Sequence, residues 1–223
     1  MRKLNHIEAG FTLVELLVVL AIVAILTATS MPALQSVLQG ANLTQAGQTL
    51  TEEINVARQI ASTRNTTVEV RLIQLAQMQN PSATGYNAIQ LFRPPTAYET
   101  PAAGSNNMMP VSKLMILPAL VVVSQDTTNY SHLLSGAAPY PVPMAVPGGQ
   151  ASYVAFHFMA SGLVQVMNGA TSVPSSTMSG LYLSAVPAIY GNKSGLPGSS
   201  GAPSNYVLVQ INPNTGNTLV YRP

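Results

Sequence analysis

The chain contains no cysteine and no tryptophan, and only 7% of its 223 residues are charged, against about 25% in an average soluble domain. The absence of cysteine excludes disulfide bonds, cysteine-ligated zinc, iron–sulfur clusters and thiol catalysis, although it does not fix the compartment. Nine basic and seven acidic residues leave a net charge of +2. Proteins that bind nucleic acid need clustered lysine and arginine, so a nucleic-acid partner is disfavoured.

Hydrophobic residues make up 47% of the chain, and many of them lie in one stretch near the N-terminus. Phe11 to Met31 reads FTLVELLVVLAIVAILTATSM, in which Glu15 is the only charged residue. As an α-helix, this segment would be about 31 Å long, close to the roughly 30 Å core of a bilayer. Arg2 and Lys3 precede it, and basic flanks tend to stay in the cytoplasm. The pattern predicts a single membrane span followed by residues that face outward.

Three interpretations of this N-terminus compete. A cleaved secretory signal would need a small-residue cleavage site, which Ala28-Thr29-Ser30 matches only loosely. An ordinary membrane anchor explains the length of the segment but leaves Glu15 unexplained. A charge at the centre of a spanning helix costs about 2.5–3.5 kcal/mol, and less near its end. The third interpretation has to supply a partner for this acid.

That interpretation rests on Gly10-Phe11-Thr12-Leu13-Val14-Glu15, which follows a short basic leader and opens the apolar helix. The motif resembles the class III signal of type IV pilins and type II secretion pseudopilins. The resemblance implies that a prepilin peptidase cuts after Gly10, that Phe11 becomes an N-methylated N-terminus and that Glu15 helps subunits to dock. Pro32 stands where the family often has a helix-kinking proline.

The chemistry of this motif is coherent in itself. Cleavage would create an ammonium group on Phe11, four residues from Glu15. Opposite charges attract strongly in a low-dielectric setting, where each alone is costly, so pairing between neighbouring subunits would neutralise both. The resemblance also implies other pilin or pseudopilin subunits, an inner-membrane assembly platform and, before assembly, membrane lipid as partners. It implies no cofactor.

The predicted fold is α+β and pilin-like, with a long N-terminal helix and a mainly antiparallel β head. Apolar residues at helical spacing predict an amphipathic helix over Ala41–Ala61, although a separate surface helix is the alternative. Its stripe consists of Leu43, Gly47, Leu50, Ile54, Ala57 and Ala61. The predicted parts are a leader peptide at 1–10, a transmembrane or filament-core helix at 11–31, a continuing amphipathic helix at 32–64 and a head at 65–223.

Alternating or apolar runs bounded by turn residues predict the strands of the head. They are a run that starts at Val68, then Ala88–Phe92, Leu114–Ser124 with an interruption at Pro118, Tyr153–Phe158, Leu163–Met167, Leu181–Ala185, Tyr206–Ile211 and Thr218–Arg222. Pro94–Pro110 and Tyr190–Ser204 are predicted to be exposed loops. The proline-rich segment Ala137–Gln150 is predicted to be a stiff connector between sheets, with polyproline recognition as the alternative.

The head offers few catalytic groups. Its acids are Glu69, Glu99 and Asp126, and no two of them share a local motif, so neither paired-carboxylate chemistry nor a calcium loop is supported. His157 lies between two phenylalanines in a predicted strand and should point away from the face that carries them. His132 is the other histidine of the head. We therefore predict no catalytic residue, no metal site and no enzymatic activity.

Looser motifs resemble the H-type minor pseudopilins. They are the helix end VARQIASTRN at 56–65, the strand start at 68–70, FHFMASG at 156–162 and the hairpin INPNTG at 211–216. The family's common proline is missing at Met159 and Ala160, and its basic residue is missing at Asn217. The resemblance implies a minor pseudopilin of a type II secretion-like system, anchored in the inner membrane with its head outside and later part of a filament. A type IV pilus minor pilin for adhesion or DNA uptake, a non-polymerising anchored binding protein and an anchored enzyme are the alternatives.

Overall fold

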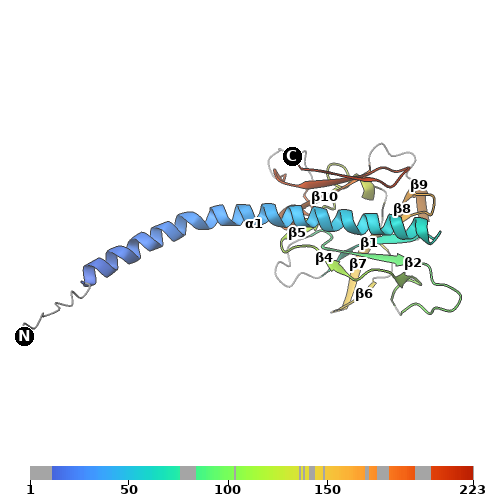
Figure 1. Ribbon diagram of the computed structural model, residues 1–223, viewed down its shortest axis with the longest axis horizontal. Helices are drawn as coiled ribbons and strands as arrows, with labels where there is room; N and C mark the ends of the chain where they lie inside the picture. Colours follow the sequence, from blue (N-terminus) through green and yellow to red (C-terminus); the bar gives the residue numbers. More distant parts are fainter. Residues whose placement is uncertain are drawn as a thin grey trace, which may run out of the picture. The chain divides into compact units, whose positions relative to one another are not determined.

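The computed structural model describes residues 12–75, 84–102, 104–135, 137, 139–140, 144–147, 149–168, 171–174, 181–193 and 202–222, but not the side chains of 29–33, 168 and 171–174. The chain divides into two compact units between Gln39 and Gly40. Each unit is described by itself. The described part of the first unit is helical, and the second unit combines a helix with two β-sheets (Figure 1).

The first unit contains the start of helix α1, which runs from Leu13 to Thr63. The helix continues through Pro32 without a break; a kink at Pro32 stays a prediction. No helix in the described residues is both long enough and apolar enough to qualify as a membrane span. The predicted span Phe11–Met31 lies partly outside those residues, because Phe11 and the side chains of residues 29–31 are not described.

The second unit begins at Gly40 and contains the rest of α1. Here the predicted apolar stripe is buried, which confirms the amphipathic helix. The helix ends in a Schellman motif, in which Asn65 adopts a left-handed conformation (φ 47°) and the amide of Thr66 donates to the carbonyl of Ala61. The buried side chains of the stripe belong to Leu43, Ala46, Leu50, Ile54, Ala57 and Ala61.

The larger sheet has eight strands, all paired antiparallel, in the order β3-β2-β1-β7-β8-β9, with β4 beside β2 and β6 beside β7. Strand β1 follows α1 directly and lies between β2 and β7. The strands are β1 Val68–Gln74, β2 Ala88–Arg93, β3 Met109–Pro110, β4 Met115–Ile116, β6 Met144–Val146, β7 Gly149–Phe158, β8 Val164–Asn168 and β9 Thr171–Pro174.

The smaller sheet is antiparallel in the order β12-β11-β10-β5, and short 3-10 helices follow β5 and β10. In Figure 1 it lies across the second half of α1 from the larger sheet. Its elements are β5 Val121–Val123, η1 His132–Leu134, β10 Leu181–Pro187, η3 Ala188–Tyr190, β11 Val207–Ile211 and β12 Thr218–Tyr221.

One apolar core joins the helix to both sheets. Leu50 and Ile54 of α1 lie in the same buried cluster as Phe156 of the larger sheet and Leu183 of the smaller one. Every member of this cluster belongs to the second unit, so this unit has a hydrophobic core of its own. The α+β fold with a long N-terminal helix and antiparallel sheets is therefore confirmed.

The predicted strands are all present, but several short elements were not predicted. These are β3, β6, β9 and the two 3-10 helices. The prediction of a stiff connector over Ala137–Gln150 is wrong for its second half, where Met144–Val146 pairs with the start of β7. Pairing is possible there because none of the paired residues Met144, Ala145 and Val146 is a proline. The predicted loop Tyr190–Ser204 lies largely outside the described residues, and Pro94–Pro110 ends in β3.

Candidate functional site

The first candidate site is the start of α1, where Thr12 and Glu15 cap the helix. The backbone amide and the hydroxyl of Thr12 donate to Oε2 of Glu15 at 2.9 and 2.8 Å. In return, the amide of Glu15 donates to Oγ1 of Thr12 at 3.3 Å. This is a capping box, which satisfies amide groups that have no partner within the helix. It places the carboxylate of Glu15 beside the N-terminus of the helix.

The helix that follows this cap exposes apolar side chains. Between Leu13 and Leu26 the large hydrophobic side chains are 48 to 81% exposed, far more than a soluble monomer normally presents in one stretch. Among the described residues 12–39, Glu15 is the only charged one. Of the predicted site residues, the structure places Glu15; Gly10, Phe11 and the side chain of Pro32 lie outside the described residues.

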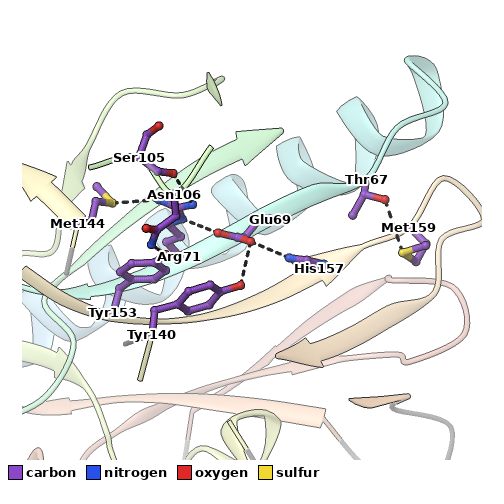
Figure 2. A network of polar contacts seen from close by, with 10 residues as sticks. All are labelled: Thr67, Glu69, Arg71, Ser105, Asn106, Tyr140, Met144, Tyr153, His157 and Met159. Carbon is purple, nitrogen blue, oxygen red and sulfur yellow. Dashed lines mark hydrogen bonds and ion pairs between the residues drawn. The ribbon is translucent and has the colours of Figure 1, made fainter. Parts of the chain in front are cut away.

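The second candidate site is a buried cluster of polar side chains in the larger sheet (Figure 2). The carboxylate of Glu69 lies at its centre. Oε1 of Glu69 accepts a hydrogen bond from Nε of Arg71, and Oε2 lies 2.8 Å from Nε2 of His157 and 3.2 Å from the hydroxyl of Tyr140. Burial alone would raise the pKa of Glu69, but the hydrogen bond from His157 and the charge of Arg71 together hold its pKa below the usual value.

Arg71 is the other charged centre of this cluster and is fully buried. Its guanidinium carbon lies 3.9 Å from the ring centroid of Phe92 and 4.5 Å from that of Tyr153, within the range of cation–π interactions. Nη2 of Arg71 donates to the carbonyl of Ser105 at 3.0 Å, and Nη1 lies 3.5 Å from the sulfur of Met144. The guanidinium therefore joins the 102–108 loop and β6 to the sheet.

The polar side chains of this cluster bond to one another and connect separate parts of the larger sheet. Both carboxylate oxygens of Glu69 have hydrogen-bond partners. The rings of Tyr140 and Tyr153 are stacked with their centroids 4.6 Å apart, and the side-chain amide of Asn106 donates to the hydroxyl of Tyr153. Burial and the neighbouring Glu69 raise the pKa of Tyr140, so its hydroxyl stays protonated. His157 lies opposite Glu69 in the β1–β7 register and points away from the buried phenylalanines, as predicted.

Arg71 was not predicted as a site residue, although it joins most of this cluster together. A signal for it existed in the sequence VEVRLIQ. Residues i and i+2 of a strand point to the same face, so Glu69 and Arg71 share one face and have opposite charges. The partners Tyr140, Met144 and His157 come from distant parts of the chain.

The remaining titratable groups of the second unit lie apart from this cluster. Glu99 receives two hydrogen bonds from the guanidinium of Arg93, and Asp126 accepts the amides of Thr128 and Asn129. His132 stacks on Tyr182. Within the part of the chain that the structure describes, no three acidic or histidine side chains lie close enough to hold a metal ion.

Comparison with known proteins bears on the N-terminal site. Residues 5–31 match the family model of the prokaryotic N-terminal methylation motif. No curated protein and no solved structure is similar enough to the chain to count as a match. The matched segment contains Gly10, Phe11, Thr12 and Glu15. It supports a type IV pilin-like prepilin signal, and with it a structural subunit of the pilin or pseudopilin type that is processed by a prepilin peptidase.

Proposed function

We propose that the chain is a minor pseudopilin of a type II secretion-like system. It is held in the inner membrane with its head outside and later becomes part of a filament. The observation that carries this proposal is the methylation motif at residues 5–31 together with the capped start of α1, where apolar side chains are exposed and Glu15 is the only charged residue of 12–39. Such a helix needs an apolar environment, and bilayer lipid and the interior of a helical filament both provide one.

In this proposal the residues of the motif have separate roles. The peptidase cuts between Gly10 and Phe11 and so removes the leader at 1–10. Phe11 is then methylated, and its amine pairs with Glu15 of a neighbouring subunit. Residues 11–31 form the membrane or filament-core segment, 32–64 continue the helix with a bend at Pro32, and 65–223 form the head. Because the amine and the carboxylate leave water together, each lowers the cost of burying the other.

The capping box adds a step to this mechanism. In the isolated chain the Glu15 carboxylate already accepts two hydrogen bonds from Thr12. The amine of a neighbouring subunit therefore has to share the Glu15 carboxylate with Thr12 or displace Thr12 from it. A carboxylate oxygen has lone pairs for more than one donor, so sharing keeps the helix start intact while the charges pair.

The H-type role rests on the loose sequence motifs, two of which form turns in the structure. The INPNTG motif forms the turn between β11 and β12, where the amide of Gly216 donates to the carbonyl of Asn212. The FHFMASG motif ends β7 and leads into the turn before β8, at Gly162 with φ 87°. These two turns lie together, since a Cβ on Gly162 would be 3.5 Å from the carbonyl of Thr215.

The processing step is tested by mass spectrometry of the mature chain, produced with and without a prepilin peptidase. We expect a chain that starts at a methylated Phe11 in the presence of the enzyme and an intact Met1 in its absence. Gly10→Ala serves as the cleavage-site variant and should accumulate precursor. A mature chain with an unmethylated N-terminus at Met31, directly after Ala28-Thr29-Ser30, would instead indicate an ordinary secretory signal and contradict the proposal.

The docking step is tested with three variants of the helix start. Glu15→Gln keeps a capping acceptor but removes the charge, Glu15→Leu removes both, and Thr12→Ala weakens the cap while keeping the charge. We expect all three to be cleaved, both Glu15 variants to be lost from sheared filaments, and Thr12→Ala to be incorporated. Normal incorporation of Glu15→Gln would exclude charge pairing as the docking mechanism.

Two other functions fit the same signal. A type IV pilus minor pilin for DNA uptake would bind DNA through its head in a salt-sensitive manner, which a binding assay on the second unit at low salt tests directly. A non-polymerising anchored protein would be cleaved but never found in filaments. An assembly ATPase, a secretin and further pseudopilin genes beside this gene would favour the secretion machine.

A further inference from the structure

We propose that the second unit rests on an anionic bilayer through a small surface at the end where the chain enters it, an inference that depends on the membrane anchoring proposed above. This entry surface consists of Leu120, Ile189, Tyr190, Lys193 and Arg222. All five belong to the unit that begins at Gly40. It combines exposed apolar side chains, an aromatic ring and two cations.

Contacts around Gly40 identify which end of the unit this is. The side-chain amide of Asn42 donates to the carbonyl of Ala119 at 3.2 Å, which places the 118–120 turn beside the first turns of α1 in this unit. Arg222 reaches the same region, since its Nη1 donates to Oγ1 of Thr44 and a Cβ on Gly40 would lie 3.1 Å from its Nη2.

Leu120 and Ile189 form the apolar part of the surface. The amide of Ala188 donates to the carbonyl of Leu120 at 2.8 Å, so the two exposed side chains belong to adjoining segments. Their exposed fractions are 56% and 59%. Leu120 also has φ 63°, a left-handed conformation that is costly for a residue with a side chain. The fold therefore holds this leucine outward at a local cost in backbone strain.

Tyr190 and Lys193 lie directly beyond Ile189. The amide of Lys193 donates to the carbonyl of Tyr190 at 3.2 Å, and its ammonium lies 5.6 Å from the centre of the Tyr190 ring. Tyrosine and lysine next to exposed aliphatic side chains are typical of segments at the membrane–water interface, where the aliphatic part enters the lipid and the polar ends stay in the headgroup layer.

The charges on this surface favour anionic lipid. Lys193 and Arg222 are both exposed. Asp126 follows Gln125, whose amide donates to the carbonyl of Gly191 two residues before Lys193, but its carboxylate is buried and bonded to Thr128 and Asn129. Glu52 lines the same groove as Arg222 but lies two helical turns beyond Thr44. Cations near a membrane attract anionic headgroups, and added salt weakens this attraction by screening the charges.

Membrane anchoring puts lipid within reach of this surface. The predicted span ends at Met31 and the unit begins at Gly40, so only a short stretch of helix separates them. The opposite end of the unit is much farther away, since Arg64 lies 24 residues (64 − 40) along α1 from Gly40, or about 36 Å. Thr96 lines a groove together with Arg64 and so lies at this opposite end. Tyr98, two residues further on and 99% exposed, is therefore a control position that should not reach lipid.

The test uses the full chain in vesicles of phosphatidylethanolamine and phosphatidylglycerol. Because the chain has no cysteine, Leu120→Cys, Ile189→Cys and Tyr98→Cys each accept one environment-sensitive fluorophore. We expect lipids with a nitroxide near the headgroup to quench the label at positions 120 and 189 but not at 98. Quenching at 120 should fall in Lys193→Gln/Arg222→Gln, in phosphatidylcholine vesicles and at high salt.

Three results would overturn the inference. If the chain floats with the vesicles but all three labels stay equally accessible to water, anchoring holds and the entry surface does not touch lipid. A blue-shifted label at 120 without nitroxide quenching would mean that a second copy of the chain covers this surface. If the chain does not float with the vesicles, the proposed anchoring itself fails, and the lipid contact fails with it.

Discussion

The guanidinium of Arg71 and the carboxylate of Glu69 form an ion pair that is almost completely shielded from water, with side chains 0% and 4% exposed. They lie two residues apart on the central strand of the larger sheet and therefore on the same face. In a chain with so few charges, this pair holds β6 and the 102–108 loop onto the sheet. Its partners are arranged around it in Figure 2.

Removing one member of this pair should strongly destabilise the second unit. Arg71→Met leaves the Glu69 carboxylate buried without its cation, and breaking such a pair typically costs about 3–5 kcal/mol. Urea unfolding of the Gly40–Pro223 unit measures this, with Arg64→Met as an exposed control. The double variant Arg71→Met/Glu69→Leu should recover part of the loss. If Arg71→Met unfolds at the same urea concentration as the unchanged unit, the pair contributes nothing.

The cluster also predicts loss of stability in acid. Because the folded pKa of Glu69 lies below its unfolded value of about 4.3, its contribution to stability is complete above that value and is lost as the pH falls through the folded pKa. The free energy of unfolding should therefore decrease below pH ~4.3. Glu69→Gln should show a shallower decrease. The hydrogen bonds from the partly buried Arg93 lower the pKa of Glu99 to about 2. This pair contributes a separate part of the decrease in stability, which Glu99→Gln should remove.

At Gly47, helix α1 lies very close to strand β11 of the smaller sheet. A Cβ there would lie 2.5 Å from Cγ1 of the buried Val207. Overpacking of this kind costs about 1–3 kcal/mol, against a gain of at most about 1 kcal/mol in helix propensity. Gly47→Ala should therefore lower the thermal midpoint. Gly40→Ala is the matched control, because its Cβ would meet only the flexible end of Arg222, and a similar loss in both variants would refute this explanation.

Gly191 should tolerate no side chain. A Cβ at this position would overlap the carbonyl oxygen of Thr84, which is backbone and has no rotamer to escape into. The carbonyl of Gly191 also accepts the amide of Gln125. We expect Gly191→Ala to lower the free energy of unfolding by more than about 4 kcal/mol and to reduce the yield of the folded second unit. Gly149→Ala is the control, because a Cβ at Gly149 would have no atom within 4 Å. Its free energy of unfolding should fall only by the strain of a side chain at φ 140°, about 1–2 kcal/mol.

Much of the fold could be predicted because its long elements carry clear periodicity. The 3.6-residue stripe of α1 and the apolar runs of β1, β7, β10 and β11 are local signals. Strand β3 has only two residues, β6 has three and β9 has four. Their pairing depends on which part of the folded sheet lies beside them, so no local pattern indicates them.

The two candidate sites also differed in how far the sequence could predict them. Glu15 was predicted from a contiguous motif. The capping role of Thr12 was not predicted, although its spacing of three residues from Glu15 is the one that a capping box requires. The buried cluster depends on Tyr140 and His157, which lie 71 and 88 residues from Glu69. The spacing of Glu69 and Arg71 could have indicated a charged pair on one strand face, but the pair was not predicted, and its burial follows from tertiary contacts. The roles of Gly10, Phe11 and Pro32 stay predictions.

The register of β1 has a consequence for the order of events during synthesis. Val68 pairs with Phe158 and Gln74 with Ser152, so the central strand of the larger sheet lacks one neighbour until about 80 further residues have been made. The smaller sheet forms later still, because β10 pairs with β11, and the β11 residues Val207–Ile211 are synthesised after the whole of β7. Such non-local pairing folds slowly. The N-terminal motif is therefore complete, and accessible to a processing enzyme, well before the domain behind it has closed.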